Sequence, residues 1–207
     1  MVLFLKSLAS YVGCLKVHAL VPLLYTIYSS KLFSIIKSHL PSAHSYVDDT
    51  QLYLSFPPLE NTGEAEALDA MEKCIADVRS WMINDKLMLN DDKTEFLVIG
   101  TSKQRSKGSF SSIRVGDVDV ISVYSVKNLG SWFDSHMDMA THITKTRGSA
   151  LFYLYNIGHI RKYLTRECTE KLIHAFISSR LDYCNGLLYE VPDRHTQKLQ
   201  RVMNASA

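Results

Sequence analysis

The stretch SYVDDTQLYLSF, residues 45–56, places two adjacent carboxylates, Asp48 and Asp49, between runs of strand-forming residues. Apolar and polar residues alternate on both sides of this short acidic centre, a pattern that predicts a β-hairpin with the two aspartates at its turn. Adjacent carboxylates repel each other at neutral pH. The pair is therefore either an acidic turn or part of a site whose cations offset the repulsion.

Helical patterns flank this hairpin. Residues 20–40 predict a helix that Pro41 ends, and residues 61–82 predict a second helix, with apolar residues at spacings of three and four. The segment LMLNDDKTEFLVIG, residues 87–100, predicts a turn at positions 90–92 followed by a short strand. A basic, serine-rich loop is expected at 101–112, and further strands at 113–115, 118–123 and 128–133.

Beyond Met139 the patterns are helical. A stripe with helical spacing runs through Ile143, Arg147, Ala150, Leu154 and Ile157. Thr165 is a candidate N-cap of a second helix, and residues 192–193 open a third. The predicted fold class is α+β, with a small α+β unit to about residue 135 and a helical unit after it.

Charge is distributed unevenly along the chain, although the net charge is only +2. Acidic residues dominate positions 64–95, and basic residues dominate after Ala140. A basic C-terminal part favours a polyanionic partner. Ordinary solvated helix faces explain the same charges equally well.

The four cysteines include no C-x-x-C pair, which argues against a zinc site and a disulfide framework. Cys168 and Cys184 lie in apolar helical patterns and are expected to be buried thiols. This usage is typical of an intracellular protein of the cytoplasm or nucleus. The apolar N-terminus is interrupted by Lys6, and residues 19–28 are too short to span a bilayer, so no membrane association is expected; a signal peptide or anchor is the less favoured alternative.

The order of the motifs resembles one protein family. YVDD on a hairpin is followed by a helix, by LMLNDDKTEFLVIG, by NLGSWFD at 128–134 and by HAFISSRLDYCNGLL at 174–188. This series resembles the reverse transcriptases of non-LTR (LINE-type, jockey-like) retrotransposons, from about Lys16 to the last residue. The resemblance implies a right-hand polymerase, with part of the palm at 16–135, the start of a helical thumb at 136–207, and an unmatched apolar segment at 1–15.

The resemblance also implies site residues. Asp48 and Asp49 would hold catalytic Mg²⁺ or Mn²⁺ for nucleotide addition to a DNA primer on an RNA template, because two-metal chemistry needs hard oxygen ligands. Lys93 would lie near the incoming triphosphate as a phosphate contact or proton donor. A solvated turn lysine explains Lys93 equally well.

Further residues would contact nucleic acid. NLGSWFD matches the element that supports the primer end in the family, so Leu129 and Gly130 would lie on a tight strand turn there. The structural alternative is a buried strand with a glycine bend, which is compatible with the same role. The resemblance also implies that the following thumb residues contact backbone phosphates and do not recognise the base sequence: Lys145, Arg147, Arg161 and Lys162.

The sequence departs from the family pattern upstream of the hairpin. The glycine-rich segment of the family reads KVHALVPLLY here, with Val17 and Val21 in place of two glycines. Family members place an aspartate-bearing strand before this segment, whereas residues 1–15 contain no Asp or Glu, and the fingers have no counterpart. We therefore expect weak metal binding and no polymerase turnover from this polypeptide alone. The alternatives are a non-catalytic nucleic-acid-binding remnant and a globular fragment without a partner.

Loss of that strand would leave an unpaired sheet edge beside Tyr53 and Phe56, which is a liability for aggregation. The apolar residues VLFL, positions 2–5, are a candidate substitute strand for this edge.

Overall fold

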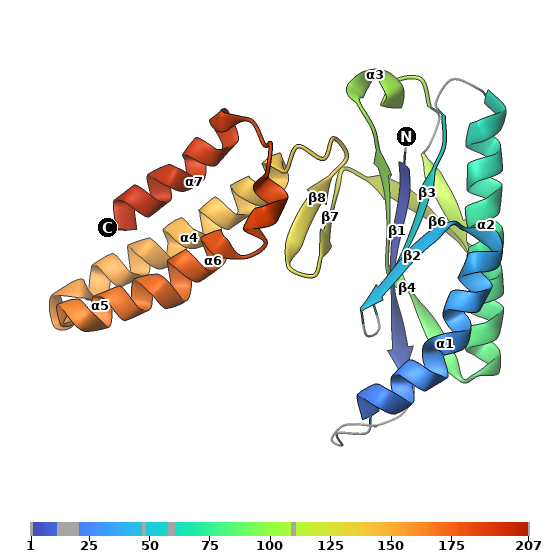
Figure 1. Ribbon diagram of the computed structural model, residues 1–207, viewed down its shortest axis with the longest axis horizontal. Helices are drawn as coiled ribbons and strands as arrows, with labels where there is room; N and C mark the ends of the chain where they lie inside the picture. The colour runs from blue at the N-terminus through green and yellow to red at the C-terminus, as the bar shows by residue number, and fades with distance from the viewer. Residues whose placement is uncertain (1, 12–20, 47–48, 58–60, 109–110, 207) are drawn as a thin grey trace. The chain divides into compact units, whose positions relative to one another are not determined.

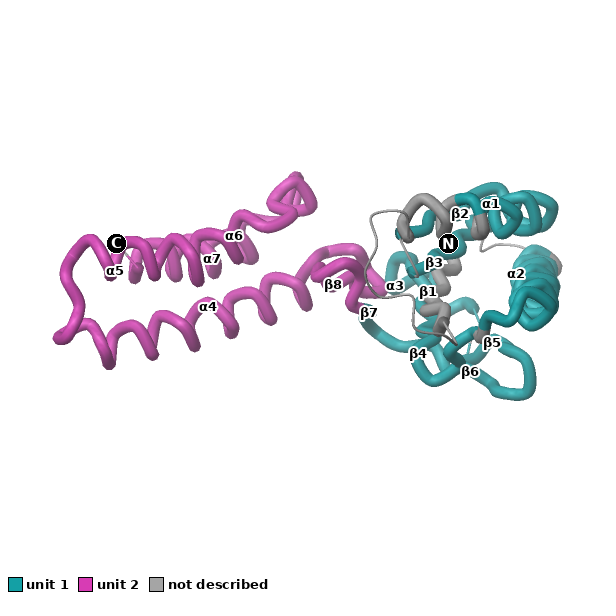
Figure 2. The backbone as a smooth tube through the Cα atoms, turned by 90° about the horizontal axis from the view of Figure 1, so that it is seen from below, with its two compact units in different colours: residues 1–126 teal, residues 127–207 magenta. Residues whose placement is uncertain are grey.

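The computed structural model describes residues 2–11, 21–46, 49–57, 61–108 and 111–206, and it combines helices with strands (Figure 1). The chain divides into two compact units, unit 1 (Met1–Val126) and unit 2 (Lys127–Ala207), which Figure 2 shows in different colours. Each unit has its own cluster of buried apolar side chains.

Unit 1 is built on a sheet with the order β2-β3-β1-β4-β6-β5. Neighbouring strands are antiparallel except for β4 and β6, which are parallel. The strands are β1 (Val2–Tyr11), β2 (Ser42–Tyr46), β3 (Asp49–Ser55), β4 (Leu87–Ile99), β5 (Ser112–Val115) and β6 (Val118–Val123). The antiparallel β2–β3 pair confirms the predicted hairpin strands.

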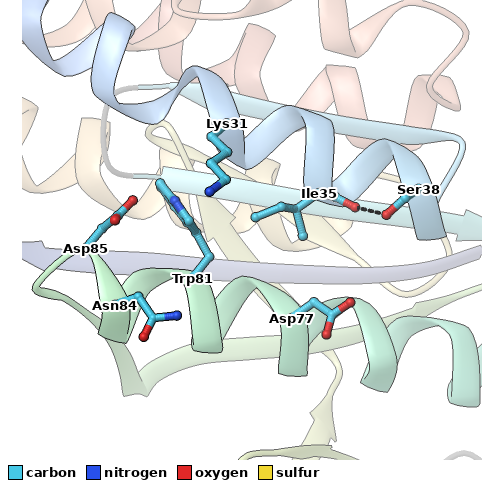
Figure 3. A pocket seen from close by; sticks show the side chains of 7 residues that line it. All are labelled: Lys31, Ile35, Ser38, Asp77, Trp81, Asn84 and Asp85. Atoms are coloured by element: carbon cyan, nitrogen blue, oxygen red, sulfur yellow. Dashed lines mark hydrogen bonds between the residues drawn. The ribbon is translucent and has the colours of Figure 1, made fainter.

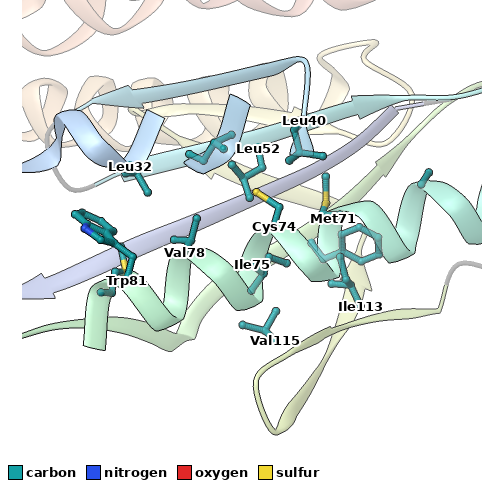
Figure 4. Packing of buried hydrophobic residues seen from close by; sticks show 14 of the residues in the cluster. Leu32, Leu40, Leu52, Met71, Cys74, Ile75, Val78, Trp81, Ile113 and Val115 are labelled. Atoms are coloured by element: carbon teal, nitrogen blue, oxygen red, sulfur yellow. The ribbon is translucent and has the colours of Figure 1, made fainter. Parts of the chain in front are cut away.

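Two helices, α1 (Val21–His39) and α2 (Asn61–Asn84), cover one face of this sheet (Figure 1). They confirm the two helices predicted on either side of the hairpin. The apolar spacing of α2 has its expected effect, because its buried residues face the sheet (Figure 4). The largest fully buried side chains of this core are those of Ile36, Leu40, Met71, Phe96, Ile113 and Val115. Full burial of an aliphatic or aromatic side chain of this size stabilises the fold by about 1.5–3 kcal/mol.

The N-terminal strand β1 lies between β3 and β4 and pairs with both. Val2 is opposite Ser55 and Leu8 is opposite Asp49, so β1 runs along the whole length of β3. The expectation that residues 2–5 cover the edge beside the hairpin is therefore confirmed. Strand β3 therefore has hydrogen-bonded neighbours on both sides and is not an edge strand.

Two local predictions in unit 1 were wrong. The expected turn at 90–92 is instead an irregularity inside β4. Lys6 of β1 is opposite Glu95 and Leu8 is opposite Asn90, so the pairing advances two residues on β1 but five on β4. The expected loop at 101–112 contains a short helix, α3 (Ser102–Arg105), and its last residue, Ser112, begins β5. The helix forms because Thr101 and Gln104 cap each other's backbone N–H groups.

Unit 2 joins a two-stranded ribbon to a group of helices (Figure 1). The ribbon is formed by β7 (Ser125–Asn128), within which the boundary between the units falls, and β8 (Ser131–Asp134). Its two strands replace the single strand predicted at 128–133. The helical elements are α4 (Ala140–Ile160), η1 (Arg161–Tyr163), α5 (Arg166–Ile173), the π-helical η2 (His174–Ser178), α6 (Ser179–Asp182), η3 (Asn185–Leu188) and α7 (Asp193–Ser206).

The core of unit 2 follows the predicted helical stripe. Ile143, Ala150 and Ile157 of α4 are buried against residues of η2, α6 and α7. Thr165 caps α5 as predicted, since its side chain accepts a hydrogen bond from the N–H of Cys168 at 3.2 Å. The prediction of buried thiols was wrong, because Cys168 and Cys184 are both exposed. Cys168 lies on the exposed side of α5, and Cys184 lies in the turn between α6 and η3.

Candidate functional site

The paired residues of the two predicted hairpin strands end at Tyr46 and Asp49. Val47 and Asp48 lie outside the described residues, so the predicted position of Asp48 stays a prediction. Asp49 is half-buried at the start of β3. The structure therefore locates one of the two predicted carboxylates.

The strand beside Asp49 brings no acid to it. Leu8 of β1 is opposite Asp49 on one side and opposite Asn90 of β4 on the other. Asp49 and Asn90 are thus two strand spacings apart, roughly 10 Å between backbones. The sequence of β1 contains no Asp or Glu. A complete site of the kind that the motif order predicts would have an aspartate on this neighbouring strand.

The described residues do not fit a two-metal centre. Mg²⁺ takes six ligands, mostly oxygens, in near-octahedral geometry, and catalytic pairs of ions share several carboxylates. Within the part of the chain that the structure describes, no group of three or more His, Cys, Asp or Glu side chains could hold a metal ion. Asp91, close to Asn90 in sequence, is engaged by an arginine.

A polar cluster next to Asp49 was not predicted from the sequence. Leu52 and Phe56 belong to the core, so the alternate residues Gln51 and Tyr53 lie on the opposite face of β3. The hydroxyl of Tyr53 donates a hydrogen bond to Oε1 of Gln51, and the ring of His44 packs edge-on against Tyr53 with centroids 5.4 Å apart. Burial raises the pKa of Tyr53, so its hydroxyl stays a donor at neutral pH.

Lys93 lies in the irregular part of β4 and is exposed. Its N–H donates to Oδ1 of Asn90 at 3.2 Å, and the hydroxyl of Thr94 donates to the carbonyl of Asn90 at 3.0 Å. These local bonds give the segment a turn-like conformation inside a strand. The structure brings no second predicted catalytic residue to Lys93 among those that it describes.

An ion pair attaches this segment to α2. The guanidinium of Arg79 donates two parallel hydrogen bonds to Asp91, with N···O distances of 2.6 and 2.9 Å. The hydrogen bond to Asp91 raises the pKa of Arg79. Arg79 also fills the space over Gly116, where an added Cβ would lie 2.8 Å from its Cζ atom. Sequence reasoning missed this pair because its members lie on different elements, without a helical spacing to relate them.

Leu129 and Gly130 form the tight turn between β7 and β8, as the resemblance implied. Both have positive φ, 45° and 91°, a backbone conformation that favours glycine. The hydroxyl of Tyr183 donates to the carbonyl of Leu129, and a Cβ at Gly130 would lie 3.0 Å from the ring. The motifs NLGSWFD and HAFISSRLDYCNGLL, separate in sequence, therefore meet at this turn.

The end of NLGSWFD has a structural role. Asp134 is completely buried, and its carboxylate accepts hydrogen bonds from the N–H groups of Asp138 at 3.0 Å and Thr141 at 3.4 Å. Nearby, Nδ1 of His142 accepts a hydrogen bond from the N–H of Trp132 at 3.3 Å. Burial lowers the pKa of His142, which keeps this nitrogen free of a proton.

The four predicted phosphate contacts lie at the surface of unit 2. Lys145 and Arg147 are on α4, Arg161 and Lys162 are in η1, and all four are exposed. Among the described residues, none of the four forms an ion pair. Nζ of Lys145 lies 5.4 Å from the ring centre of Trp132, and Nζ of Lys162 lies 4.9 Å from that of Tyr163. Their charges are available to an anion.

A cavity of about 330 Å³ lies between α1 and α2 (Figure 3). Its walls carry mixed charge, since Lys31, Asp77 and Asp85 line it together with Trp81. Asp77 is already bonded to Nε2 of His39 at 2.7 Å. The cavity contains no hairpin residue and lies on the helical side of the sheet, so it is separate from the predicted metal site.

No family model, curated protein or solved structure matches the chain. No helix among the described residues is long and apolar enough to cross a bilayer. The function must therefore be inferred from the order of the motifs and from the geometry of the two units.

Proposed function

We propose that the chain is a piece of an RNA-directed DNA polymerase of the non-LTR retrotransposon kind, made of palm and thumb elements. Two features support this proposal. The motifs occur along the chain in the order of that family, and the YVDD segment joins two strands of a mostly antiparallel sheet with helices on one face. That layered arrangement suits a polymerase palm, in which a hairpin aims carboxylates from the face opposite the helices.

We also propose that this polypeptide does not add nucleotides on its own. The observation that carries this conclusion is the position of β1, which pairs beside the hairpin and brings Leu8 opposite Asp49. Nucleotide addition by two metal ions requires carboxylates from more than one strand, because each ion needs several oxygen ligands. The hairpin offers Asp48 and Asp49, and the adjacent strand offers none.

A primer-extension assay tests this conclusion directly. The full chain is incubated with an RNA template, a DNA primer, deoxynucleotides and either Mg²⁺ or Mn²⁺, next to the variants Asp48→Ala and Asp49→Ala. We expect the same background signal from all three proteins. Primer extension by the wild type that disappears in Asp48→Ala would show that the chain completes a catalytic site, and would overturn the proposal of inactivity.

The second candidate function is nucleic-acid binding by unit 2. This unit carries eleven Lys and Arg against seven Asp and Glu, a net charge of +4, whereas unit 1 has twelve against fourteen. If Lys145, Arg147, Arg161 and Lys162 each neutralise one phosphate, the affinity for a single strand should fall with salt with a log–log slope of about −3. Filter binding across a salt series measures this slope. An affinity that does not change with salt would contradict phosphate recognition.

A further inference from the structure

Helix α4 presents an outward row of residues that we call the outer stripe. Its members are spaced alternately by three and four positions, so they lie along one side of the helix and its continuation into η1. They are Lys145, Gly148, Phe152, Tyr155, His159 and Lys162, and all are exposed. Figure 2 shows α4 on one side of unit 2, with α5, α6 and α7 on the other.

The aromatic residues of the outer stripe are unusually accessible. Phe152 is 60% exposed and Tyr155 is 67% exposed. Tyr153, between them in sequence, is used differently: it stacks on Phe176 with ring centres 5.1 Å apart, and the guanidinium of Arg180 lies 4.5 Å from its ring centre. The fold therefore uses Tyr153 for packing. Phe152 and Tyr155 make edge-type contacts instead, with Tyr153 at 5.4 Å and with His159 at 4.3 Å between ring centres, and most of each side chain stays exposed. Neighbouring exposed aromatic side chains are typical of an interaction site.

The charge around the outer stripe selects an anionic partner. From Met139 to Arg166 the sequence contains five Lys and Arg residues and no Asp or Glu. A second copy of the chain is a poor occupant, because two stripes packed in antiparallel directions would bring Lys145 against Lys162 of the other copy. Like charges in contact are destabilising, and the segment offers no acid to pair with them. A polyanion meets no such repulsion.

We propose that the outer stripe binds single-stranded nucleic acid, with bases stacked on Phe152 and Tyr155 and phosphates held by Lys145 and Lys162. Sequence-tolerant binding to single strands combines two components, aromatic rings on which bases stack and cations that hold the phosphates, and the outer stripe has both. A base in a duplex is already stacked on both faces, so a ring on the convex surface of a helix can stack only on an unpaired base. This proposal deepens the nucleic-acid-binding role of unit 2 and rests on it.

Gly148 adds to the shape of the stripe. A Cβ at this position would meet no atom within 4 Å, so the glycine leaves an open gap between Lys145 and Phe152. The gap lets the backbone of a bound strand approach the helix between a cation and the first aromatic ring. Along the helix axis, the distance from Lys145 to Lys162 is roughly 25 Å, long enough for several nucleotides.

The test measures fluorescence anisotropy of the full chain with three labelled probes of equal length: an oligo(U) strand, an abasic strand with the same phosphates, and a duplex. The variants are Phe152→Ala and Tyr155→Ala, together with Phe152→Trp and Tyr155→Trp. Two controls lie outside the stripe. Tyr189→Ala removes another exposed aromatic side chain, and Lys171→Gln removes a surface cation that is paired with Glu167 at 2.6 Å. Thermal melts establish that each variant is folded.

We expect oligo(U) to bind more tightly than the abasic strand and the duplex. Each alanine variant should weaken oligo(U) binding by about five-fold or more, as expected for loss of one stacked base, and should leave abasic binding unchanged. The tryptophan variants and both controls should retain the wild-type affinity.

Equal affinity for oligo(U) and the abasic strand, or a preference for duplex, would overturn the stacking proposal while leaving salt-dependent nucleic-acid binding intact. Failure to bind any probe at low salt would overturn both. Phosphatidylserine vesicles serve as a further probe, and binding to them without binding to oligo(U) would assign the stripe to a lipid surface and reject the proposal.

Discussion

The ion pair between Arg79 and Asp91 should stabilise unit 1 measurably, unlike the ion pairs on the surface of the same helix. The pair joins α2 to the irregular segment of β4 that carries Lys93. Its two hydrogen bonds are short, and the side chains are only 30% and 23% exposed. A partly buried pair with two parallel hydrogen bonds contributes more to stability than an exposed pair, because water replaces its bonds less well when the pair breaks.

The magnitude follows from the number and type of the bonds. A hydrogen bond to a charged group contributes about 1.5–3 kcal/mol, and partial exposure reduces this contribution. We therefore expect Arg79→Met to lower the free energy of unfolding of unit 1 by about 2 kcal/mol, including the loss of contact with Gly116. A double-mutant cycle with Asp91→Asn should give a coupling energy of about 1–2 kcal/mol.

The assay is urea denaturation followed by fluorescence, and the chain offers a reporter for unit 1. It has two tryptophans, Trp81 in unit 1 and Trp132 in unit 2, so a Trp132→Phe background leaves Trp81 to report on unit 1 alone. The matched control is the pair of Lys73 and Asp69, which lies on α2 with an N···O distance of 2.7 Å and exposures of 65% and 61%.

The control pair should give a coupling of about 0.5 kcal/mol or less, as surface pairs four residues apart do. A coupling between Arg79 and Asp91 no larger than that of the control would refute the reasoning from burial and geometry.

Three further outcomes are expected. Burial lowers the pKa of His142, so the unfolded chain binds a proton at this histidine at a higher pH than the folded chain does, and unit 2 should lose stability as the pH falls below about 6.5. Thermal melts over a pH series should show a weaker dependence of stability on pH in His142→Asn. Burial, and next Asp77, raises the pKa of Cys74 to about 12, so mass spectrometry after brief alkylation at pH 8 should find Cys168 and Cys184 labelled and Cys74 unlabelled until urea is added. Gly158→Ala should stabilise unit 2 by up to about 1 kcal/mol and so raise its thermal midpoint, because alanine favours a helix more than glycine does and an added Cβ meets no atom within 4 Å. A lower midpoint would contradict this expectation.

Exposed cysteines illustrate why some sequence predictions failed. Cys168 and Cys184 were assigned to the interior from the apolar residues around them in sequence. Cys168 is exposed because a helix buries only one side, and Cys184 is exposed in the turn that follows α6. Thr169, the neighbour of Cys168, is buried instead. The same limit applies to the segment at 90–92, where residues typical of a turn occur inside a strand because β1 pairs on both sides of the irregularity. Composition over a few residues does not report which side faces the core.

The candidate site was predictable in part for a similar reason. The hairpin strands, the turn at Leu129 and Gly130, and the exposure of the four predicted phosphate contacts follow from local patterns and from the order of the motifs. The outer stripe could have been found from its alternating spacing of three and four, but only the structure identifies which side of α4 is buried. The hydrogen bond from Tyr183 to Leu129 had no signal in the sequence, because the partners are 54 residues apart.

By itself, the sequence determined the elements with strong periodicity: α1, α2, α4, the strands of the hairpin and the cap at Thr165. These depend on the backbone geometry of a few consecutive residues and on which of them are apolar. It also determined that no acid precedes Asp48. Only the tertiary structure decided that β1 pairs beside Asp49, that Arg79 holds Asp91, and that the rings of Phe152 and Tyr155 remain exposed. The physical reason is that strand neighbours and buried charges depend on the sum of many weak interactions between distant segments, and no local pattern encodes that sum.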